Sequence, residues 1–384
     1  MTGATAPAAA PVVTGLGVLS ACGRGIAPLA EATVHGKAAF GAVSRFDVSG
    51  RRVHRAALLP DAPPLAEAVL QALGDACGQA AGTGQASGQA SGAGPGRAAD
   101  GSGTPLLLAL HSDSGTARTA ARIAEGARLW GIPCVTRVYT GACVAAGTAV
   151  ADAAAMISSG RAHRVVVAAG HLVGAGVFAA FDAGRALARD GEVRPFSAGR
   201  TGTLLGDAAV AVVLESPAEA GRRGAPVLAR LLGWGRSGDA HHVCRPVPDG
   251  NGLARAIDAA LRRGGIAPEQ VGYLNANATG SPLADQAEAN ALHRVFGGYA
   301  DRLPVSSTKG VHGHALEASA LLELAVTIAA LQSGTLPVNA GWTGQDEDCR
   351  LDLVLDQPRP TRPDYALTVN SAFGGANTAL LVAT

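Results

Sequence analysis

The sequence predicts an α/β protein whose sheets and helices lie in layers. Short apolar runs alternate along the chain with longer segments in which apolar residues recur at helical spacing. The apolar runs are continuous rather than alternating with polar residues, which is typical of strands buried on both faces. Strands that alternate with helices are typical of layered α/β folds. A third observation, a helix candidate that is apolar nearly all round, raises the expected number of layers to five.

The strand candidates are the continuous apolar runs. In chain order they cover residues 11–17, 104–110, 163–170, 207–215, 227–233, 271–276 and 366–383. The helix candidates fall between them, at residues 115–130, 144–159, 252–263, 281–295 and 317–333.

The helix candidate at 144–159 reads VAAGTAVADAAAMISS and has almost no polar face. A helix that is apolar all round belongs in the interior of a protein. If one sheet lies on each side of it, and helices cover the outer faces, the fold has five layers.

Residues 78–104 form a low-complexity segment of Gly, Ala, Ser and Gln, with two tandem GQAS units. This composition buries too little apolar surface to offset the entropy lost on ordering. We expect a flexible surface loop here. An interdomain linker is the alternative, but the part of the chain before the segment is short for a domain.

The composition excludes several classes of protein. The net charge is +1, from 31 basic and 30 acidic residues, whereas nucleic-acid-binding proteins usually carry a basic excess. No run of 18 apolar residues indicates a membrane span, and the N-terminus lacks the basic region of a signal peptide. The six cysteines are scattered without a CxxC pair, so we expect neither a disulfide framework nor a structural zinc site. A cytoplasmic protein with reduced thiols is the default expectation.

Cys143, in TGACVAAG, directly precedes the buried helix candidate. The positive end of a helix dipole favours the thiolate, and the small residues around Cys143 leave room for a substrate. The alternative is a small buried core residue, which is the commonest environment of a free cysteine.

Three further segments follow in the C-terminal half: NANATGSPLAD from residue 275, SSTKGVHGHALEAS from 306 and NSAFGGAN from 370. With the cysteine motif, and with PVVTGLGVLSACG and RPFSAGRTGTLLGDAAVAVVLES, this order resembles the β-ketoacyl synthase family of the thiolase-like superfamily. The resemblance covers the chain apart from residues 78–104. It implies a thiolase-like five-layered αβαβα fold of two pseudo-symmetric halves, which we place at residues 1–216 and 217–384.

The resemblance also implies a set of site residues. Cys143 matches the nucleophile that accepts an acyl group from a carrier-protein thioester. His314 matches a His that positions the malonyl group, Lys309 a supporting Lys, and Glu323 the acid that pairs with this Lys. The substrate pocket would include residues that match the family's Thr and glycine-rich loop, namely Thr279, Phe373, Gly374 and Gly375. For the two glycines, a plain turn at the end of a strand is the alternative.

The chain departs from the family at three places. The family's first active-site His is Asn277 here, and an amide can donate and accept hydrogen bonds but cannot exchange a proton. The segment before the nucleophile is shorter than in the family, where it contributes to the dimer interface and the acyl pocket wall. The loop NSAFGGAN is one residue short of the family pattern, so Phe373 is aligned only to within one position.

Two other segments contain histidines that could lie near the substrate pocket. His242, in DAHHVC, matches a family element near the pocket entrance, and we expect it to line the substrate channel rather than to bind zinc, because no second ligand pair follows. His312 lies two residues before His314 and is either a pocket residue or exposed. We predict no metal and no cofactor.

The function that the resemblance implies is acyl transfer through a Cys143 thioester, in a pathway of the fatty-acid or polyketide type. Decarboxylative condensation is in question because of Asn277. The alternatives are a non-elongating transacylase and a non-catalytic partner subunit of the chain-length-factor kind. The expected partners are an acyl carrier protein, through its phosphopantetheine thioester, or acyl-CoA, and a second ketosynthase-like subunit in a homodimer or heterodimer.

Overall fold

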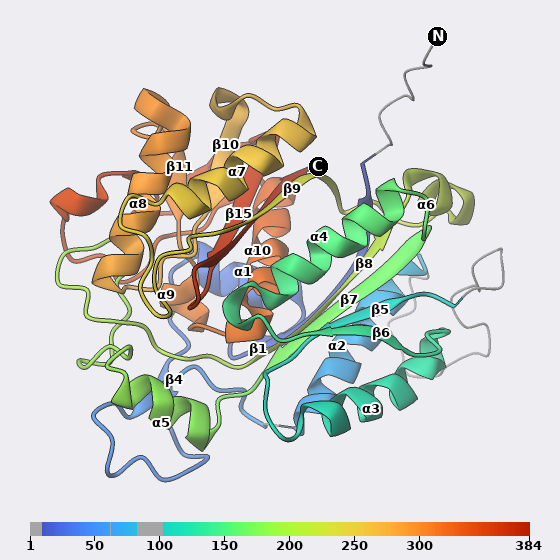
Figure 1. Cartoon of the computed structure of the whole chain (residues 1–384), viewed down its shortest axis with the longest axis horizontal. Coiled ribbons are helices and arrows are strands. Elements are labelled where there is room, and N and C mark those ends of the chain that lie inside the picture. The colour runs from blue at the N-terminus through green and yellow to red at the C-terminus, as the bar shows by residue number, and fades with distance from the viewer. Residues whose placement is uncertain (1–9, 62, 83–102) are drawn as a thin grey trace.

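The structure is a computed structural model that describes residues 10–61, 63–82 and 103–384 (Figure 1). Within these residues most strands join in one sheet of 12 strands. Its order is β13-β11-β10-β15-β16-β9-β1-β8-β7-β5-β6, with β2 paired to β1. The two halves of this sheet meet where β1 pairs with β9 over only two residues, Val12 with Arg230 and Val13 with Ala229.

The two halves repeat one topology. In each half the five main strands, numbered by their order in the chain, lie in the order 3-2-4-5-1 across the sheet. Strands 2, 3 and 4 are parallel to one another where they pair, and strand 5 is antiparallel to strands 4 and 1. In the N-terminal half the strands are β1 (Val12–Ser20), β5 (Leu106–Ala109), β6 (Val135–Tyr139), β7 (Arg164–His171) and β8 (Ala208–Glu215). In the C-terminal half they are β9 (Ala229–Gly238), β10 (Val271–Asn275), β11 (Pro304–Ser306), β15 (Tyr365–Ser371) and β16 (Ala376–Ala383).

Helices complete the layers (Figure 1). Between the two halves of the sheet lie α4 (Ala145–Ser158) and α10 (Ser319–Ser333), which form one core with the inner strand faces. On the outer face of the N-terminal half lie α2 (Leu65–Ala80) and α3 (Thr116–Ala127). On the outer face of the C-terminal half lie α7 (Asn251–Gly264) and α8 (Pro282–Phe296). This arrangement confirms the five-layered αβαβα fold of two pseudo-symmetric halves.

Glycine pairs let the outer helices approach the first strand of each half. A Cβ atom on Gly17 of β1 would lie 1.8 Å from the carbonyl oxygen of Ala72 in α2. A Cβ atom on Gly235 of β9 would lie 1.7 Å from the carbonyl oxygen of Ala256 in α7. Because real Cβ atoms essentially never come this close, only glycine permits this packing distance. Both halves therefore have a glycine where the first strand contacts its outer helix.

Several expectations need correction. The run at 366–383 is not one strand but two, β15 and β16, because Gly374 and Gly375 adopt positive φ angles and turn the chain. Residues 78–80 belong to α2 rather than to a loop, since the helix packs its alanines on β1. Of the predicted loop, residues 83–102 lie outside the described residues. The division between the halves at residue 216 stays a prediction.

The sequence patterns did not predict the remaining helices or the shortest strands. The helices are α1 (Ile26–Val34), α5 (Ala175–Ala183), α6 (Pro217–Arg223) and α9 (Lys309–His312). The two-residue strands are β2 (Gly23–Arg24), β3 (Gly41–Ala42), β4 (Arg55–Ala56), β12 (Thr335–Leu336), β13 (Asp352–Leu353) and β14 (Arg359–Pro360). The 3-10 helices are Arg128–Trp130, Ala142–Val144, Pro268–Gln270, Gly297–Tyr299, Leu316–Ala318 and Glu347–Cys349.

Within residues 10–61, 63–82 and 103–384, one helical stretch, Leu316–Ser333, is long and apolar enough to cross a bilayer. It is 83% buried inside the protein, where it forms the central layer together with α4. Burial of this kind is the behaviour of a core helix.

Candidate active site

Segments that follow the parallel strands of both halves come together at one place. Cys143 lies in the 3-10 helix Ala142–Val144, between β6 and α4. Lys309 and His314 lie between β11 and α10, which is the equivalent position in the C-terminal half. The carboxyl ends of parallel strands are the usual place for a site in open α/β sheets. Here the two sets of ends face each other, so each half contributes part of one site.

Cys143 and His314 form the centre of the site. The distance from Cys143 Sγ to His314 Nε2 is 3.0 Å, and both side chains are buried. On its other side the His314 ring is held by Ser319, whose Oγ lies 3.0 Å from Nδ1. Burial, with the nearby Lys309 ammonium, lowers the pKa of His314 well below its usual value. The imidazole is therefore neutral near pH 7 and can accept a proton.

The Cys143 thiol is not a thiolate in the resting protein. Burial, together with the Glu317 carboxylate, raises its pKa to about 12. Loss of solvation thus opposes the thiolate that a position before a helix favours. Ala142, the preceding residue, has a φ angle of 51°, a left-handed conformation that an alanine rarely adopts. Strain of this kind is typical of backbone that presents a functional side chain.

Lys309 and Glu323 form an ion pair with no solvent exposure on either side chain. The second Glu323 oxygen, Oε2, accepts a hydrogen bond of 2.6 Å from the Asn370 side chain. Burial raises the pKa of Glu323, whereas Lys309 and Asn370 counteract that rise by stabilising the charged form. The pair fixes a cation beside the catalytic candidates, since Lys309 Nζ also donates to Asn277 Oδ1 at 3.3 Å.

Asn277 is buried next to Lys309. An ammonium group can only donate, so the amide oxygen of Asn277 faces Lys309 and its NH₂ group points elsewhere. The main-chain nitrogen of Asn277 donates to Glu288 Oε1 at 2.8 Å. Burial, together with the nearby Asp285, raises the pKa of Glu288 to about 8. The sequence patterns did not single out Glu288, although it holds this part of the loop in place.

Thr279 lies half-buried on the same loop. Its main-chain nitrogen donates to Asp285 Oδ1 at 3.0 Å. The other oxygen of Asp285 accepts from the main-chain nitrogens of Phe196 and Gly280. The Asp285 carboxyl therefore organises the loop, and burial raises its pKa to about 6.

Of the expected pocket residues in the glycine-rich loop, Phe373 and Gly374 lie at the surface, whereas Gly375 is buried. Phe373 is 54% exposed, and its ring centroid lies 5.9 Å from that of Phe181 in α5. Phe181 and Ala372 pack against the hydrophobic cluster that contains Cys143. The glycine-rich loop therefore extends from the site to the surface, with Phe373 on its outer side.

His242 lies on the adjacent loop and is exposed. Its Nδ1 accepts hydrogen bonds from the main-chain nitrogens of Cys244 and Arg245, so it is folded onto its own loop. The two loops are joined, since Gly374 N donates to Val243 O and Asp239 N donates to Gly375 O, both at 2.8 Å.

His312 is neither exposed nor free. It is fully buried, with Nε2 2.9 Å from Thr308 Oγ1 and Nδ1 2.7 Å from Gly313 O. Burial and Lys309 lower its pKa to about 3. His312 is thus a neutral residue of the core.

The sequence patterns missed a second cluster beside the nucleophile. Glu317 lies in the 3-10 helix Leu316–Ala318, which packs against both the Cys143 helix and the end of β7. His111 Nδ1 lies 2.9 Å from Glu317 Oε1, and His171 Nδ1 lies 3.3 Å from Glu317 Oε2. Glu317 lies in the segment quoted from residue 306, but His111 and His171 are far from it in the sequence, so only the fold brings the three together.

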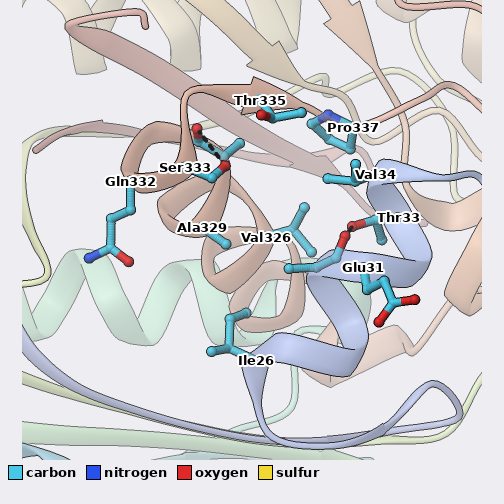
Figure 2. Close-up of a pocket in the computed structure, with 12 residues that line it drawn as sticks. Ile26, Glu31, Thr33, Val34, Val326, Ala329, Gln332, Ser333, Thr335 and Pro337 are labelled. Carbon is cyan, nitrogen blue, oxygen red and sulfur yellow. Dashed lines mark hydrogen bonds between the residues drawn. The ribbon is translucent and has the colours of Figure 1, made fainter. Parts of the chain in front are cut away.

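Five cavities of the described residues lie elsewhere. A mainly apolar cavity of about 480 Å³ separates α1 from the end of α10, with Ile26, Val34 and Val326 among its lining residues (Figure 2). Four further cavities, of about 250 to 670 Å³, are lined by other surface segments. None of these five cavities includes Cys143 or His314. Among the described residues no group of three or more His, Cys, Asp or Glu side chains could hold a metal ion.

Comparisons with known proteins show which families this chain matches. Residues 65–220 match the family described as "Beta-ketoacyl synthase, N-terminal domain", and residues 228–343 match "Beta-ketoacyl synthase, C-terminal domain". The chain is 40% identical over 189 residues to 3-oxoacyl-[acyl-carrier-protein] synthase 2 of Coxiella burnetii, covering 49% of this chain and 46% of that protein. It is 41% identical over 244 residues to Nodulation protein E of Rhizobium meliloti, covering 63% and 60%. The chain thus spans about half to three fifths of the length of these curated relatives.

Solved structures match over nearly the whole chain. The ishigamide ketosynthase/chain length factor superposes with a TM-score of 0.85 at 26% identity, covering 98% of this chain and 99% of that one. A type II polyketide synthase ketosynthase, solved with its acyl-carrier protein, superposes with a TM-score of 0.86 over the same shares. At 23% identity the second match is evidence for the fold alone.

Proposed function

Because the chain belongs to the β-ketoacyl synthase family, we propose that it is an acyltransferase that carries its acyl group as a thioester on Cys143. The single observation that carries the proposal is the contact of 3.0 Å between Cys143 Sγ and the Nε2 atom of a neutral His314. A thiol with a raised pKa needs a base within hydrogen-bond reach, and His314 is such a base.

The proposed reaction begins with transfer of the Cys143 proton to His314 Nε2. The sulfur then attacks the thioester carbonyl carbon, and the bond from that carbon to the carrier's sulfur breaks. The carrier leaves as a thiol once its sulfur has taken up a proton. The NH₂ group of Asn277, turned away from Lys309, is a candidate donor to the carbonyl oxygen as negative charge develops there. Lys309 and Glu323 support this arrangement without touching the acyl group.

We propose acyl transfer as the core activity and leave condensation as a separate step. Decarboxylative condensation of a malonyl thioester would use the same Cys143 thioester as electrophile. Asn277 cannot exchange a proton, which favours a non-elongating transacylase if no other group replaces the missing imidazole. The thioester donor is an acyl carrier protein or acyl-CoA. The setting is a cytoplasmic pathway of the fatty-acid or polyketide type.

A second candidate function is a non-catalytic partner subunit. It is favoured by Asn277, by the raised pKa of Cys143 and by the match to a ketosynthase/chain length factor. In that case the chain would form a heterodimer with an active ketosynthase subunit, whereas a catalytic chain would also fit a homodimer.

Intact-mass measurement distinguishes these functions. The protein is incubated with an acylated carrier protein, and acyl transfer predicts one covalent acyl adduct. The Cys143→Ala variant should lose the adduct, whereas Cys349→Ala, which removes another buried cysteine, should keep it. No adduct on the unmodified protein, or an undiminished adduct on Cys143→Ala, contradicts the proposal and favours the partner subunit.

Addition of a malonyl carrier protein then separates the two catalytic outcomes. Carbon dioxide release with a lengthened acyl chain shows condensation. An adduct that passes to a second carrier thiol without carbon dioxide release shows transacylation. If Asn277 is what prevents condensation, Asn277→His should gain it.

A further inference from the structure

Three polar residues form a chain of contacts beside the nucleophile, and only Glu317 belongs to a motif quoted above. His111 follows β5, His171 ends β7, and Glu317 reaches them from the C-terminal half. His111 is 39% exposed at its side chain, whereas Glu317 and His171 are 3% and 2% exposed. The chain of contacts therefore leads from the surface to the interior.

The orientation of His171 gives it the geometry of an acid–base group. Its Nδ1 lies 3.3 Å from Glu317 Oε2, and a proton on that nitrogen would be stabilised by the carboxylate. The other ring nitrogen, Nε2, then points away from Glu317. It is buried and has no hydrogen-bond partner among the described residues. A buried polar atom without a partner is uncommon in native proteins and requires an explanation.

The fold places His171 beside the segments that carry the reacting groups. The 3-10 helix that carries Glu317 also packs against the helix that carries Cys143, and His314 lies three residues before Glu317. Cys143, His111 and His171 all follow or end parallel strands of the same half, β6, β5 and β7, which are neighbours in the sheet. A substrate thioester at Cys143 would therefore lie at the same sheet edge as His171.

We infer that His171, oriented by Glu317, is the second imidazole of the active site and serves as the acid–base group of the carrier thiol. The inference rests on the proposed acyl transfer. His314 handles the proton of Cys143, and His171 handles the proton of the incoming or leaving carrier sulfur. A second imidazole, besides that of His314, can then act in the site from position 171 even though position 277 is an asparagine.

The proton balance closes over one cycle of acyl transfer. In loading, the Cys143 proton moves to His314 Nε2, and the new carbon–sulfur bond forms. The bond to the carrier sulfur breaks, and that sulfur takes the Nε2 proton of a His171 imidazolium. In transfer to an acceptor thiol, His171 takes the acceptor's proton and His314 returns its proton to the Cys143 sulfur. Both histidines end in the states from which they started.

The charges around His171 suit this role. Hydrogen bonds from His171 and His111 lower the pKa of Glu317 despite its burial, so a carboxylate faces His171. The His111 and His171 rings are 6.4 Å apart. Asp207, whose Oδ1 accepts from Val173 N just after β7, is paired with Arg45 at 2.6 Å. Lys309 acts on His314 from the other side of the site.

The test uses thioesters with different leaving groups on the full chain. The rate of Cys143 acylation is followed by intact mass with an acylated carrier protein and with an acyl thiophenyl ester. A thiophenolate leaves without protonation, whereas the alkyl thiolate of a carrier needs a proton. The His171→Gln variant should slow transfer from the carrier about 100-fold or more, and it should leave transfer from the thiophenyl ester and alkylation of Cys143 by iodoacetamide near the rates of the unmodified protein.

Matched controls separate catalysis from folding. His163→Gln makes the same substitution at the exposed residue just before β7 and should change neither rate. Glu317→Gln removes the positioning charge. It should slow transfer from the carrier and flatten its pH profile, while iodoacetamide reacts faster, because Glu317 raises the pKa of Cys143.

The outcomes distinguish the two proposals. Equal slowing of both thioesters and of alkylation by His171→Gln indicates a structural role and overturns the inference. An unchanged rate from the carrier also overturns it, but leaves acyl transfer through Cys143 standing. An unmodified protein that forms no acyl adduct with either thioester refutes the proposed function itself and the inference with it.

Discussion

Replacing Lys309 with methionine should destabilise the protein more than any surface change. The side chains of Lys309 and Glu323 have no solvent exposure. Without Lys309, the Glu323 carboxylate keeps only the hydrogen bond from Asn370 and remains buried without a cation. Removing one partner of a buried ion pair typically costs about 3 to 5 kcal/mol, because an uncompensated charge is left behind.

This cost converts into a shift of the unfolding temperature. The entropy of unfolding near 60 °C is about 2.1 cal/mol/K per residue, which for this chain of 384 residues is about 0.8 kcal/mol/K. The Lys309→Met variant should therefore unfold about 4 to 6 °C below the unmodified protein, measured by differential scanning calorimetry at pH 7. The loss should shrink at lower pH, because burial raises the pKa of Glu323 and its protonated form needs no cation.

The double variant Lys309→Met/Glu323→Leu provides the decisive control. Because it removes both charges, it should recover most of the stability that the single variant loses. A single variant within about 1 °C of the unmodified protein would refute the reasoning, as would a double variant less stable than the single one. Since Lys309 also holds Asn277 Oδ1, the double variant should remain impaired in acyl transfer even when its stability returns.

Three further predictions concern other parts of the molecule. His314→Gln removes the base 3.0 Å from Cys143 and should slow acylation about 100-fold or more, followed by time-resolved intact mass; an unchanged rate contradicts the proposed base. Burial raises the pKa of Glu288 to about 8, so the folded protein favours the protonated carboxyl. The stability that this preference contributes is fully present below the unfolded pKa of Glu288 and is lost as pH rises through about 8. Glu288→Gln should therefore gain stability relative to the unmodified protein between pH 5 and 9, by about 2 to 4 kcal/mol in urea unfolding, and a constant difference would contradict this. Gly147→Val in α4 should destabilise by about 1 to 3 kcal/mol, because a Cβ there would lie 2.6 Å from Thr378 Oγ1; Gly176→Val, where nothing lies within 4 Å, is the matched control.

The layered fold could be predicted from the sequence because its signals are local. Continuous apolar runs such as 207–215 identify buried strands, and the all-apolar segment at 144–159 identifies the central helix α4. Helix α2 was missed because its sequence contains Gly74 and Gly78 and runs into the low-complexity segment. The helix is stabilised by packing on the glycines of β1, and the sequence of α2 alone does not indicate that contact.

The site was predictable only where residues form short motifs. Lys309 and His314 share one segment, so the resemblance of that segment to the family's motif could assign both. The partnership of His171 with Glu317 joins residues 146 positions apart, and it depends on the carboxyl end of β7 facing the C-terminal half. The raised pKa of Cys143 likewise depends on burial by distant segments, so the position of Cys143 before a helix could not predict it.

The place of β1 in the sheet has a consequence for how the chain folds as it is made. Residues 12–20 leave the ribosome early, yet their main partners are residues 208–215 of β8. At a synthesis rate of about 5 to 20 residues per second, β1 waits about 10 to 40 s for that partner. During this time an apolar strand reading VVTGLGVLS has no sheet to join. Neither half of the sheet is complete until then, so the N-terminal half cannot fold as a finished unit ahead of β8. Folding of this protein in the cell should therefore depend on holding chaperones more than its compact final state suggests.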